Sequence, residues 1–365
     1  MVYVFVTYNF SLDCDSPQSW FKRTAPYVGI LHTLSEKNTV INVKQIHFEG
    51  DCIHRGIQYR FVNFGKKESH FPWKLNRYVK TLNPDIVFVQ GLHVPLQVIQ
   101  LRMLLGRKVK IIVQNHAEKP QTGARKYLQR LASYCIDAYL FASRYMGMDW
   151  VKKGNLADSG KIHEVMEVSS GFNPIERSIA VEKTKVKGKP VFLWVGRLNE
   201  NKDPLNVVKG FLKFIDSEPS AHLYMIYHTD ELLTQIQDLL KSDKNKEAIT
   251  LIGQVAHQEL LYWYNSADII LSGSHYEGSG TAVCEAMSCG CMPLVTDIFS
   301  FRMITDGGRC GLLYEAANEG ALLAALKKTQ QMDIKEKQQA SLKFFKSNLS
   351  FEAIAHRIQA VAESL

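Results

Sequence analysis

The sequence predicts an α/β protein in which two parallel sheets form two separate domains. Its 365 residues exceed what one ordinary hydrophobic core holds. Short apolar runs typical of buried strands alternate with helical patterns along the whole chain, which favours two facing Rossmann-like domains. The predicted strands lie at 2–7, 85–90, 109–114, 137–142, 191–195, 222–227, 249–252, 268–273 and 292–296.

The boundary between the domains falls in 169–190, where turn residues are followed by charged sequence without periodicity. We therefore place an N-terminal domain at 1–172 and a C-terminal domain at 173–350. In the remaining segment, 351–365, the spacing of Ile354, Ile358 and Val361 predicts a helix with one apolar side.

Composition describes an ordinary globular protein, with 46% hydrophobic and 22% charged residues. The first residues, MVYVFVTY, lack the basic segment of a signal peptide and read as a buried strand. No run approaches the ~20 apolar residues that a membrane span requires. Seven cysteines without a paired CxxC framework indicate reduced thiols and no zinc site. These features predict a cytoplasmic protein.

Positive charge is concentrated in the N-terminal half. Residues 1–175 hold 23 Lys and Arg against 13 Asp and Glu, while the whole chain has a net charge of +8. The basic stretches are 66–80, 102–110 and 124–130, and the first interleaves its cations with Phe71, Trp73 and Tyr78. This pattern suits peripheral contact with an anionic membrane, such as the inner face of the plasma membrane, and equally a solvated basic face. No signature of a nucleic-acid-binding motif is present.

A basic motif follows the predicted strand at 191–195. Gly196 ends the strand, the loop carries Arg197 and Lys202, and Asp203-Pro204 then opens a helix. The loop lies at the carboxyl end of a strand, where open α/β sheets bind ligands. Arg197 can hold phosphate oxygens in a bidentate fork and Lys202 supplies a compact charge. Taken alone, this motif is better explained as a pair of solvated loop charges, and the second motif reverses this interpretation.

An acidic motif, EGSGTAVCE, follows the predicted strand at 268–273 and runs from Glu277 to Glu285. Its two glycines, Gly278 and Gly280, let the backbone approach a ligand closely. A helix predicted from Thr281 directs its N-terminus at this turn, which favours phosphate. Glu285 can accept hydrogen bonds from both ribose hydroxyls, and Glu277 would face a transferred sugar. Two cations and two carboxylates around a glycine turn suit a nucleotide sugar.

These motifs resemble those of retaining glycosyltransferases of family four, also called glycosyl transferases group 1, which have the GT-B fold. The similar segments are VGRLNENKDPLNVVKGF (195–211), the run from Leu251 to Gly290, PLVTD (293–297) and GRCGLLY (308–314). The resemblance implies that Arg197 and Lys202 bind the donor diphosphate, that Glu285 holds the ribose and that Glu277 lies at the donor sugar. It implies further that Gly253, Gln254 and Val255 border the nucleobase, and that Gly278, Ser279, Gly280 and Thr281 supply backbone amides to the sugar and phosphate. It also implies that no metal is needed and that the terminal helix packs back on the first domain.

The N-terminal domain is expected to bind the acceptor. Its best candidate is His116, which follows a predicted strand and which the resemblance places near the reacting sugar. Glu118, Lys119 and His93 are weaker candidates. Asp13-Cys14-Asp15 has the DxD spacing of metal-dependent transferases of another fold, but such triplets are common by chance.

The sequence therefore predicts a retaining glycosyltransferase that uses a nucleoside diphosphate sugar, UDP- or GDP-linked, and no further cofactor. The acceptor is a glycan, a lipid-linked sugar or a small molecule, and cell-surface polysaccharide or glycoconjugate synthesis is the expected setting. Two alternatives stay open: a nucleotide-sugar epimerase or hydrolase on the same fold, and a non-catalytic sugar-nucleotide-binding module.

Overall fold

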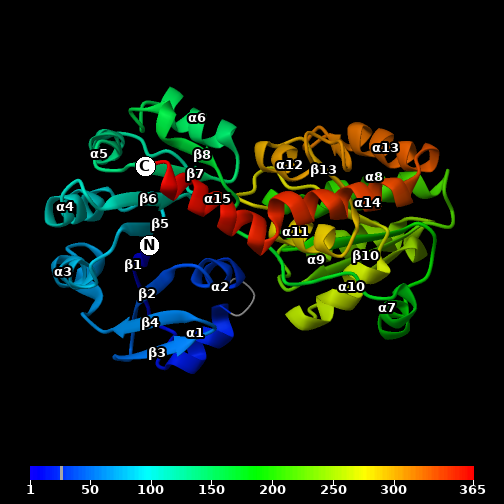
Figure 1. Ribbon diagram of the computed structural model, residues 1–365. Helices are drawn as coiled ribbons and strands as arrows, with labels where there is room; N and C mark the ends of the chain where they lie inside the picture. Colours follow the sequence, from blue (N-terminus) through cyan, green and yellow to red (C-terminus); the bar gives the residue numbers. More distant parts are fainter. Residues whose placement is uncertain (25–27) are drawn as a thin grey trace. The chain divides into compact units, whose positions relative to one another are not determined.

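A computed structural model of the chain describes residues 1–24 and 28–365 (Figure 1). The chain divides into two compact units: unit 1 comprises Met1–Ser169 and Phe351–Leu365, and unit 2 comprises Ser170–Ser350. Each unit is built on a sheet covered by helices, and each of the nine predicted runs forms a strand. The predicted α/β class with mainly parallel sheets is therefore confirmed. Within the described ranges, no helix has the length and apolar character needed to cross a membrane.

Unit 1 contains an eight-stranded sheet within the described residues, in the order β3-β4-β2-β1-β5-β6-β7-β8. Every pair is parallel except β3 and β4, which form a hairpin. The strands are β1 (Val2–Ser11), β2 (Thr39–Ile46), β3 (Gly50–His54), β4 (Ile57–Val62), β5 (Ile86–Gln90), β6 (Lys110–Gln114), β7 (Ala138–Phe141) and β8 (Ile162–Glu164).

Helices cover both faces of this sheet (Figure 1). One layer consists of α3 (Trp73–Thr81), α4 (Pro95–Leu105) and α5 (Ala124–Ser133), which pack in succession. The other side carries α2 (Gly29–Ser35) and the terminal helix α15 (Phe351–Glu363), which pack on each other. The remaining helices of the unit are α1 (Pro17–Thr24) and α6 (Arg144–Lys152).

Unit 2 spans residues 170–350, all of which the structure describes, and contains a six-stranded parallel sheet. Its order is β11-β10-β9-β12-β13-β14. The strands are β9 (Val191–Gly196), β10 (His222–Tyr227), β11 (Ile249–Gly253), β12 (Ile269–Ser272), β13 (Met292–Thr296) and β14 (Leu312–Tyr314). The helices are α7 (Arg177–Thr184), α8 (Pro204–Ile215), α9 (Leu233–Ser242), α10 (Leu260–Ser266), α11 (Thr281–Ser288), α12 (Phe299–Ile304), α13 (Glu319–Lys328) and α14 (Ile334–Phe344).

Aromatic packing fixes α8 against β9. Phe211 of α8 is fully buried, and its ring centroid lies 5.2 Å from that of Phe192 and 5.9 Å from that of Phe214. The Phe192–Phe211 pair is edge-to-face, and such a pair adds to the free energy of apolar burial. Because β9 and α8 flank the loop that carries Arg197 and Lys202, this core determines where the loop lies.

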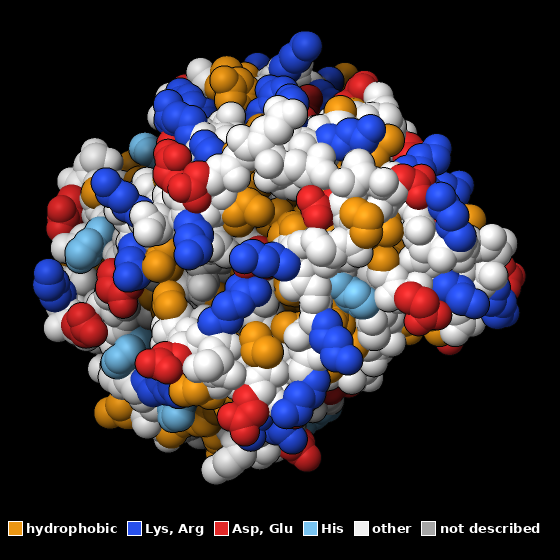
Figure 2. Space-filling model, turned by 90° about the vertical axis from the view of Figure 1, so that its right-hand side faces the viewer, with side chains coloured by type: hydrophobic (Ala, Val, Ile, Leu, Met, Phe, Trp, Pro, Cys, Tyr) orange, Lys and Arg blue, Asp and Glu red, His pale blue; other side chains and the backbone are white. Residues whose placement is uncertain are grey.

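Surface charge in the face shown in Figure 2 is mixed. Basic and acidic side chains are interspersed there, and hydrophobic side chains are scattered in small groups (Figure 2). Such a face is typical of an ordinary solvated surface.

We expect Phe211→Ala to lower the free energy of unfolding by about 3–5 kcal/mol, because it leaves a cavity in a close-packed core. Denaturant unfolding measures this loss. The matched control is Ile179→Ala on α7, where the side chain is 48% exposed, and its effect should stay within about 0.5 kcal/mol. Equal losses in the two variants would contradict the central position of Phe211.

Candidate functional site

The loop after β9 is shaped by local hydrogen bonds. The side chain of Asn199 accepts a hydrogen bond from the backbone N–H of Lys202 at 3.1 Å and closes a tight turn over Glu200–Lys202. Asp203 then adopts a left-handed conformation with φ of 46°, and its side chain caps α8 by accepting from Asn206 N. The Asp-Pro helix start predicted from the sequence is therefore confirmed. These bonds fix the backbone from which the Lys202 side chain projects.

A second loop, which follows β12, is bonded directly to the first. The N–H of His275 donates to the carbonyl of Asn201 at 2.8 Å, and Asn201 Nδ2 donates to the carbonyl of Tyr276 at 3.0 Å. His275 Nε2 also lies 2.9 Å from Asp203 Oδ2. Since β9 and β12 pair in the sheet, both loops lie at the same carboxyl edge and form one unit.

The charged residues of the two loops meet at this edge. Lys202 Nζ and Glu277 Oε1 form an ion pair whose side chains are 25% and 14% exposed. Arg197 lies in the same loop as Lys202 and is exposed. Within residues 1–24 and 28–365 its guanidinium has no ion-pair partner, so its charge is available to an anion.

Helix α11 begins beside this charged pair. Gly280 precedes it with φ of +64°, and a Cβ there would lie 2.6 Å from the Phe301 ring, so only glycine fits without a shift. Gly278 is half-buried, Ser279 is 5% exposed, and Thr281 is the first helical residue. The N-cap residue Gly280 has no side chain to cap this N-terminus, and the backbone N–H groups and dipole of the helix favour an anion.

Glu285 lies inside α11 and is 5% exposed. One carboxylate oxygen is 2.7 Å from His257 Nε2, and the other accepts a hydrogen bond from the Tyr264 hydroxyl at 2.9 Å. Phe172 stacks on the His257 ring with a centroid distance of 5.1 Å. The hydrogen bond to Glu285 raises the pKa of His257, although partial burial opposes this. The Glu285 carboxylate is thus oriented before any ligand binds.

The remaining predicted donor contacts follow β11, at one end of the sheet order. Gly253 is the last residue of the strand and has φ of +80°. Gln254 is exposed and Val255 is half-buried. His257 follows two residues later, which connects this segment to Glu285.

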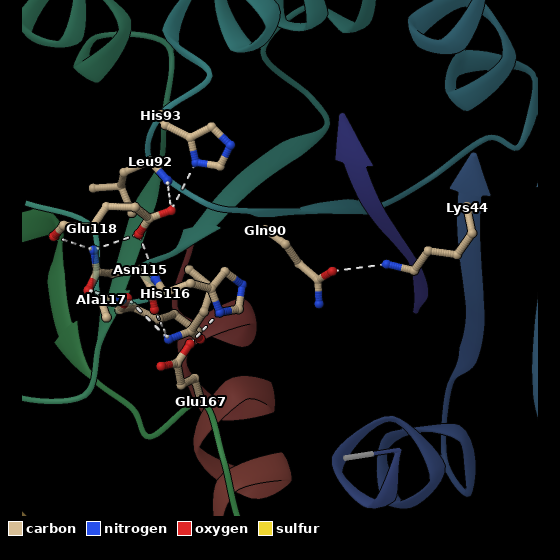
Figure 3. Close-up of polar contacts among 11 residues, drawn as sticks. Lys44, Gln90, Leu92, His93, Asn115, His116, Ala117, Glu118 and Glu167 are labelled. Carbon is tan, nitrogen blue, oxygen red and sulfur yellow. Dashed lines mark hydrogen bonds and ion pairs between the residues drawn. The ribbon is translucent and has the colours of Figure 1, made fainter. Parts of the chain in front are cut away.

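A second polar cluster lies in unit 1 at the carboxyl end of β6, and it contains His116 (Figure 3). His116 Nδ1 contacts Glu167 Oε2, and the His116 N–H donates to Glu118 Oε2 at 2.6 Å. The other oxygen of Glu118 accepts from Leu92 N at 3.0 Å and lies 3.1 Å from His93 Nδ1. Burial lowers the pKa of His116, but the bond and charge of Glu167 outweigh it, and the net direction is upward.

The structure therefore brings most of the predicted donor residues together in unit 2, while His116 belongs to unit 1. Sequence reasoning missed His257 and Tyr264, which hold Glu285, and Glu167, which contacts His116. Each pair joins residues 21 to 51 positions apart in the chain, so no local motif marks them.

His93 and Glu118, the weaker candidates, contact each other in the His116 cluster. Arg102, counted in a basic stretch, is 6% exposed and pairs with Asp137.

The DxD triplet shows no metal-binding geometry. Asp13 and Asp15 are both exposed in the loop after β1. Across the described ranges 1–24 and 28–365, no group of three or more His, Cys, Asp or Glu side chains is placed to hold a metal ion.

Solved structures similar to this chain define its fold. A glycosyltransferase from Rickettsia africae has a TM-score of 0.75 at 16% identity and covers 100% of this chain and 97% of its own. HepE from Anabaena, solved in complex with UDP, has a TM-score of 0.75 at 11% identity and covers all of both chains. The fold is therefore the GT-B fold of glycosyltransferases.

The C-terminal half is similar to a known family. Residues 176–342 match the model of the glycosyl transferases group 1 family. Mannosylfructose-phosphate synthase from Agrobacterium fabrum is 31% identical over 140 residues, which is 36% of this chain and 30% of that protein. The chain thus spans about a third of the length of the curated relatives that it matches.

The His257–Glu285 pair predicts a pH-dependent contribution to stability. Because the pKa of His257 is raised in the folded protein, the charged pair stabilises the fold fully below the ordinary value of about 6.5 and loses this effect as the pH rises through the higher folded value. We expect the difference in unfolding free energy between wild type and His257→Gln to shrink as the pH rises from about 5.5 to about 8.5. Denaturant unfolding at both pH values tests this.

The matched control for this experiment is Glu285→Gln, which removes the anion. In that background His257→Gln should change stability equally at both pH values. If the difference in unfolding free energy between wild type and His257→Gln grew with pH, the assignment of a charged His257–Glu285 pair would be contradicted.

Proposed function

We propose that the protein is a retaining glycosyltransferase that moves a sugar from a nucleoside diphosphate sugar to an acceptor. Unit 2 binds the donor and unit 1 binds the acceptor. The observation that carries this proposal is the joined pair of loops in unit 2, where Arg197, the Lys202–Glu277 pair and the start of α11 lie at one edge of the sheet. This arrangement brings two cations and a helix N-terminus to one edge of the sheet, as a diphosphate requires.

The charges account for leaving-group stabilisation. As the glycosidic bond to the diphosphate breaks, negative charge grows on the phosphate oxygens, and fixed positive charge nearby lowers the barrier. Arg197 has no competing anion in the described parts of the chain and takes the phosphate first. Lys202 joins it, while Glu277, held by Lys202, accepts hydrogen bonds from the donor sugar. No divalent cation is required in this scheme, because the basic side chains supply the charge.

Glu285 is assigned to the ribose. His257 and Tyr264 each donate to one of its oxygens, and a carboxylate has about four acceptor positions, so it can still accept from the ribose hydroxyls. The UDP complex of HepE supports uridine as the base, and GDP-linked donors are the alternative. Gly253, Gln254 and Val255 follow the neighbouring strand β11 and are assigned to the base.

The mechanism is assigned as front-face attack with retention. A double-displacement route needs a carboxylate nucleophile at the anomeric carbon, and Glu277 is already held by Lys202 for hydroxyl binding. In the proposed route the acceptor hydroxyl attacks the anomeric carbon, the bond to the diphosphate breaks, and the acceptor's proton passes to the leaving phosphate. His116, oriented through its Nδ1 by Glu167, is the unit 1 group assigned to the reacting sugar or hydroxyl.

We expect Arg197→Ala to reduce turnover about 10²- to 10³-fold, because it removes a charge that acts on the developing phosphate anion. Release of nucleoside diphosphate from UDP- and GDP-sugars, with a panel of acceptors, measures this. The folded fraction should not change, since Arg197 is exposed.

The control is Lys209→Ala, which removes an exposed cation on α8 and should leave turnover unchanged. Unchanged turnover in Arg197→Ala would remove the phosphate assignment. Donor consumed at the same rate without any acceptor would point instead to a hydrolase or epimerase.

The surface of unit 1 supports a peripheral membrane contact. The helix layer α3–α5 exposes large apolar side chains, among them Met103 at 80%, Tyr127 at 70% and Leu131 at 57%. Phe71, just before α3, is 75% exposed, and Trp73 has the Arg77 guanidinium 4.7 Å above its ring. Exposed cations of the same layer are Lys74, Arg77, Lys80, Arg107, Lys108, Arg125 and Arg130. Apolar rings and side chains among cations suit an anionic lipid surface, such as the inner leaflet of the plasma membrane, and a lipid-linked acceptor.

We therefore expect the protein to cosediment with vesicles rich in phosphatidylglycerol and not with phosphatidylcholine vesicles. The double variant Met103→Ser with Leu131→Ser should weaken this binding while the charge stays constant. The control double variant, Phe48→Ser with Ile53→Ser, removes exposed apolar groups near the β3 edge. Equal losses in both double variants would contradict the helix layer as the contact surface.

A further inference from the structure

Lys44 is a buried cation without an anionic partner. It lies on β2 and is only 4% exposed. Its ammonium donates one hydrogen bond, to Gln90 Oε1 at 2.9 Å, and lies 5.3 Å from the centre of the Trp20 ring. Within residues 1–24 and 28–365, no carboxylate lies within ion-pair distance of it. Since the Gln90 contact is its one hydrogen bond to the described residues, two of its three N–H groups are left for another acceptor.

Such an arrangement is unfavourable unless something compensates the charge. A buried ammonium without an anion loses its hydration and lacks the attraction that would replace it. Burial lowers the pKa of Lys44 to about 7, which shows the size of this cost. A lysine that only filled space would direct its ammonium to water, whereas Lys44 directs it to the Gln90 side chain.

The position of this pair indicates where a compensating group would come from. Gln90 is the last residue of β5, and His116 follows β6, the next strand in the sheet. Figure 3 shows the Gln90 side chain between His116 and Lys44. The charge of Lys44 also lowers the pKa of His116, so the two groups act on the same region. This region is the carboxyl edge of the unit 1 sheet, where α/β folds bind ligands.

We propose that Lys44 and Gln90 form a binding subsite for an oxyanion, phosphate or carboxylate, that the acceptor carries. This proposal rests on the proposed function only where it identifies the ligand as the acceptor. The oxyanion accepts the two remaining N–H groups of Lys44, and the amide N–H of Gln90 is a further donor. The acceptor hydroxyl then lies toward His116. This subsite is separate from the donor diphosphate site, which is assigned to unit 2.

Trp20 provides a local probe for the test. Protein labelled with 5-fluorotryptophan gives ¹⁹F signals for its five tryptophans, and Trp20→Phe assigns the Trp20 signal. Inorganic phosphate should shift this signal saturably and leave that of Trp150, which is buried elsewhere in unit 1, in place. Lys44→Met, which keeps the length of the side chain, should weaken phosphate binding about 10- to 100-fold, as expected for the loss of charge-assisted hydrogen bonds. Gln90→Met is the second variant and should weaken it less.

The outcomes separate the claims. If the Trp20 signal does not respond to phosphate, or responds equally in Lys44→Met, the subsite does not exist. If glucose 6-phosphate or glucuronate binds more tightly than inorganic phosphate, the result supports an oxyanion carried by the acceptor. If these sugars bind with the same affinity as inorganic phosphate, the acceptor assignment is overturned. Stabilisation by nucleoside diphosphate should be the same in wild type and Lys44→Met. If nucleoside diphosphate stabilised neither protein, only the proposed function would be contradicted, because the ¹⁹F response to phosphate does not depend on donor binding.

Discussion

The ion pair between Lys202 and Glu277 is the interaction on which the proposed donor site depends. It closes a set of contacts in which the loops after β9 and β12 are already bonded through Asn201 and His275. Adjacent parallel strands bring their carboxyl ends to one edge, and the two loops meet there because β12 pairs with β9. In the proposed site this pair holds a carboxylate for sugar hydroxyls, and Arg197, which has no ion-pair partner within the described chain, is left for the phosphate. One contact would thus organise both the sugar side and the phosphate side of the proposed site.

Both units use the same device to fix a functional side chain: a second residue, distant in sequence, orients it. In unit 2 the carboxylate of Glu285 is held by His257 and Tyr264, and in unit 1 the imidazole of His116 is held by Glu167. Such support reduces the entropy lost when a ligand binds. The two histidines share a further property: the contacting carboxylate raises the pKa of His257 and of His116.

The local part of the fold and site could be read from the sequence, and the long-range part could not. The start of α8 at Asp203-Pro204 and the start of α11 after Gly280 depend on neighbouring residues only. Strand β2 was missed because buried Asn42, Lys44 and Gln45 interrupt its apolar pattern, and β3, β4, β8 and β14 were also missed. The contacts of His116 with Glu167 and of Lys44 with Gln90 join residues 51 and 46 positions apart. Only the folded sheet brings such residues together.

The most direct test of the account is calorimetric titration with a nucleoside, its monophosphate and its diphosphate, in parallel uridine and guanosine series. The account predicts that affinity increases with each phosphate for one base, since Arg197, Lys202 and the α11 N-terminus all act on phosphate. It predicts that high salt reduces this increase, because the interaction is between charges. Equal affinity for nucleoside and diphosphate, or no binding in either series, would contradict the assignment of this edge of the sheet to a donor diphosphate.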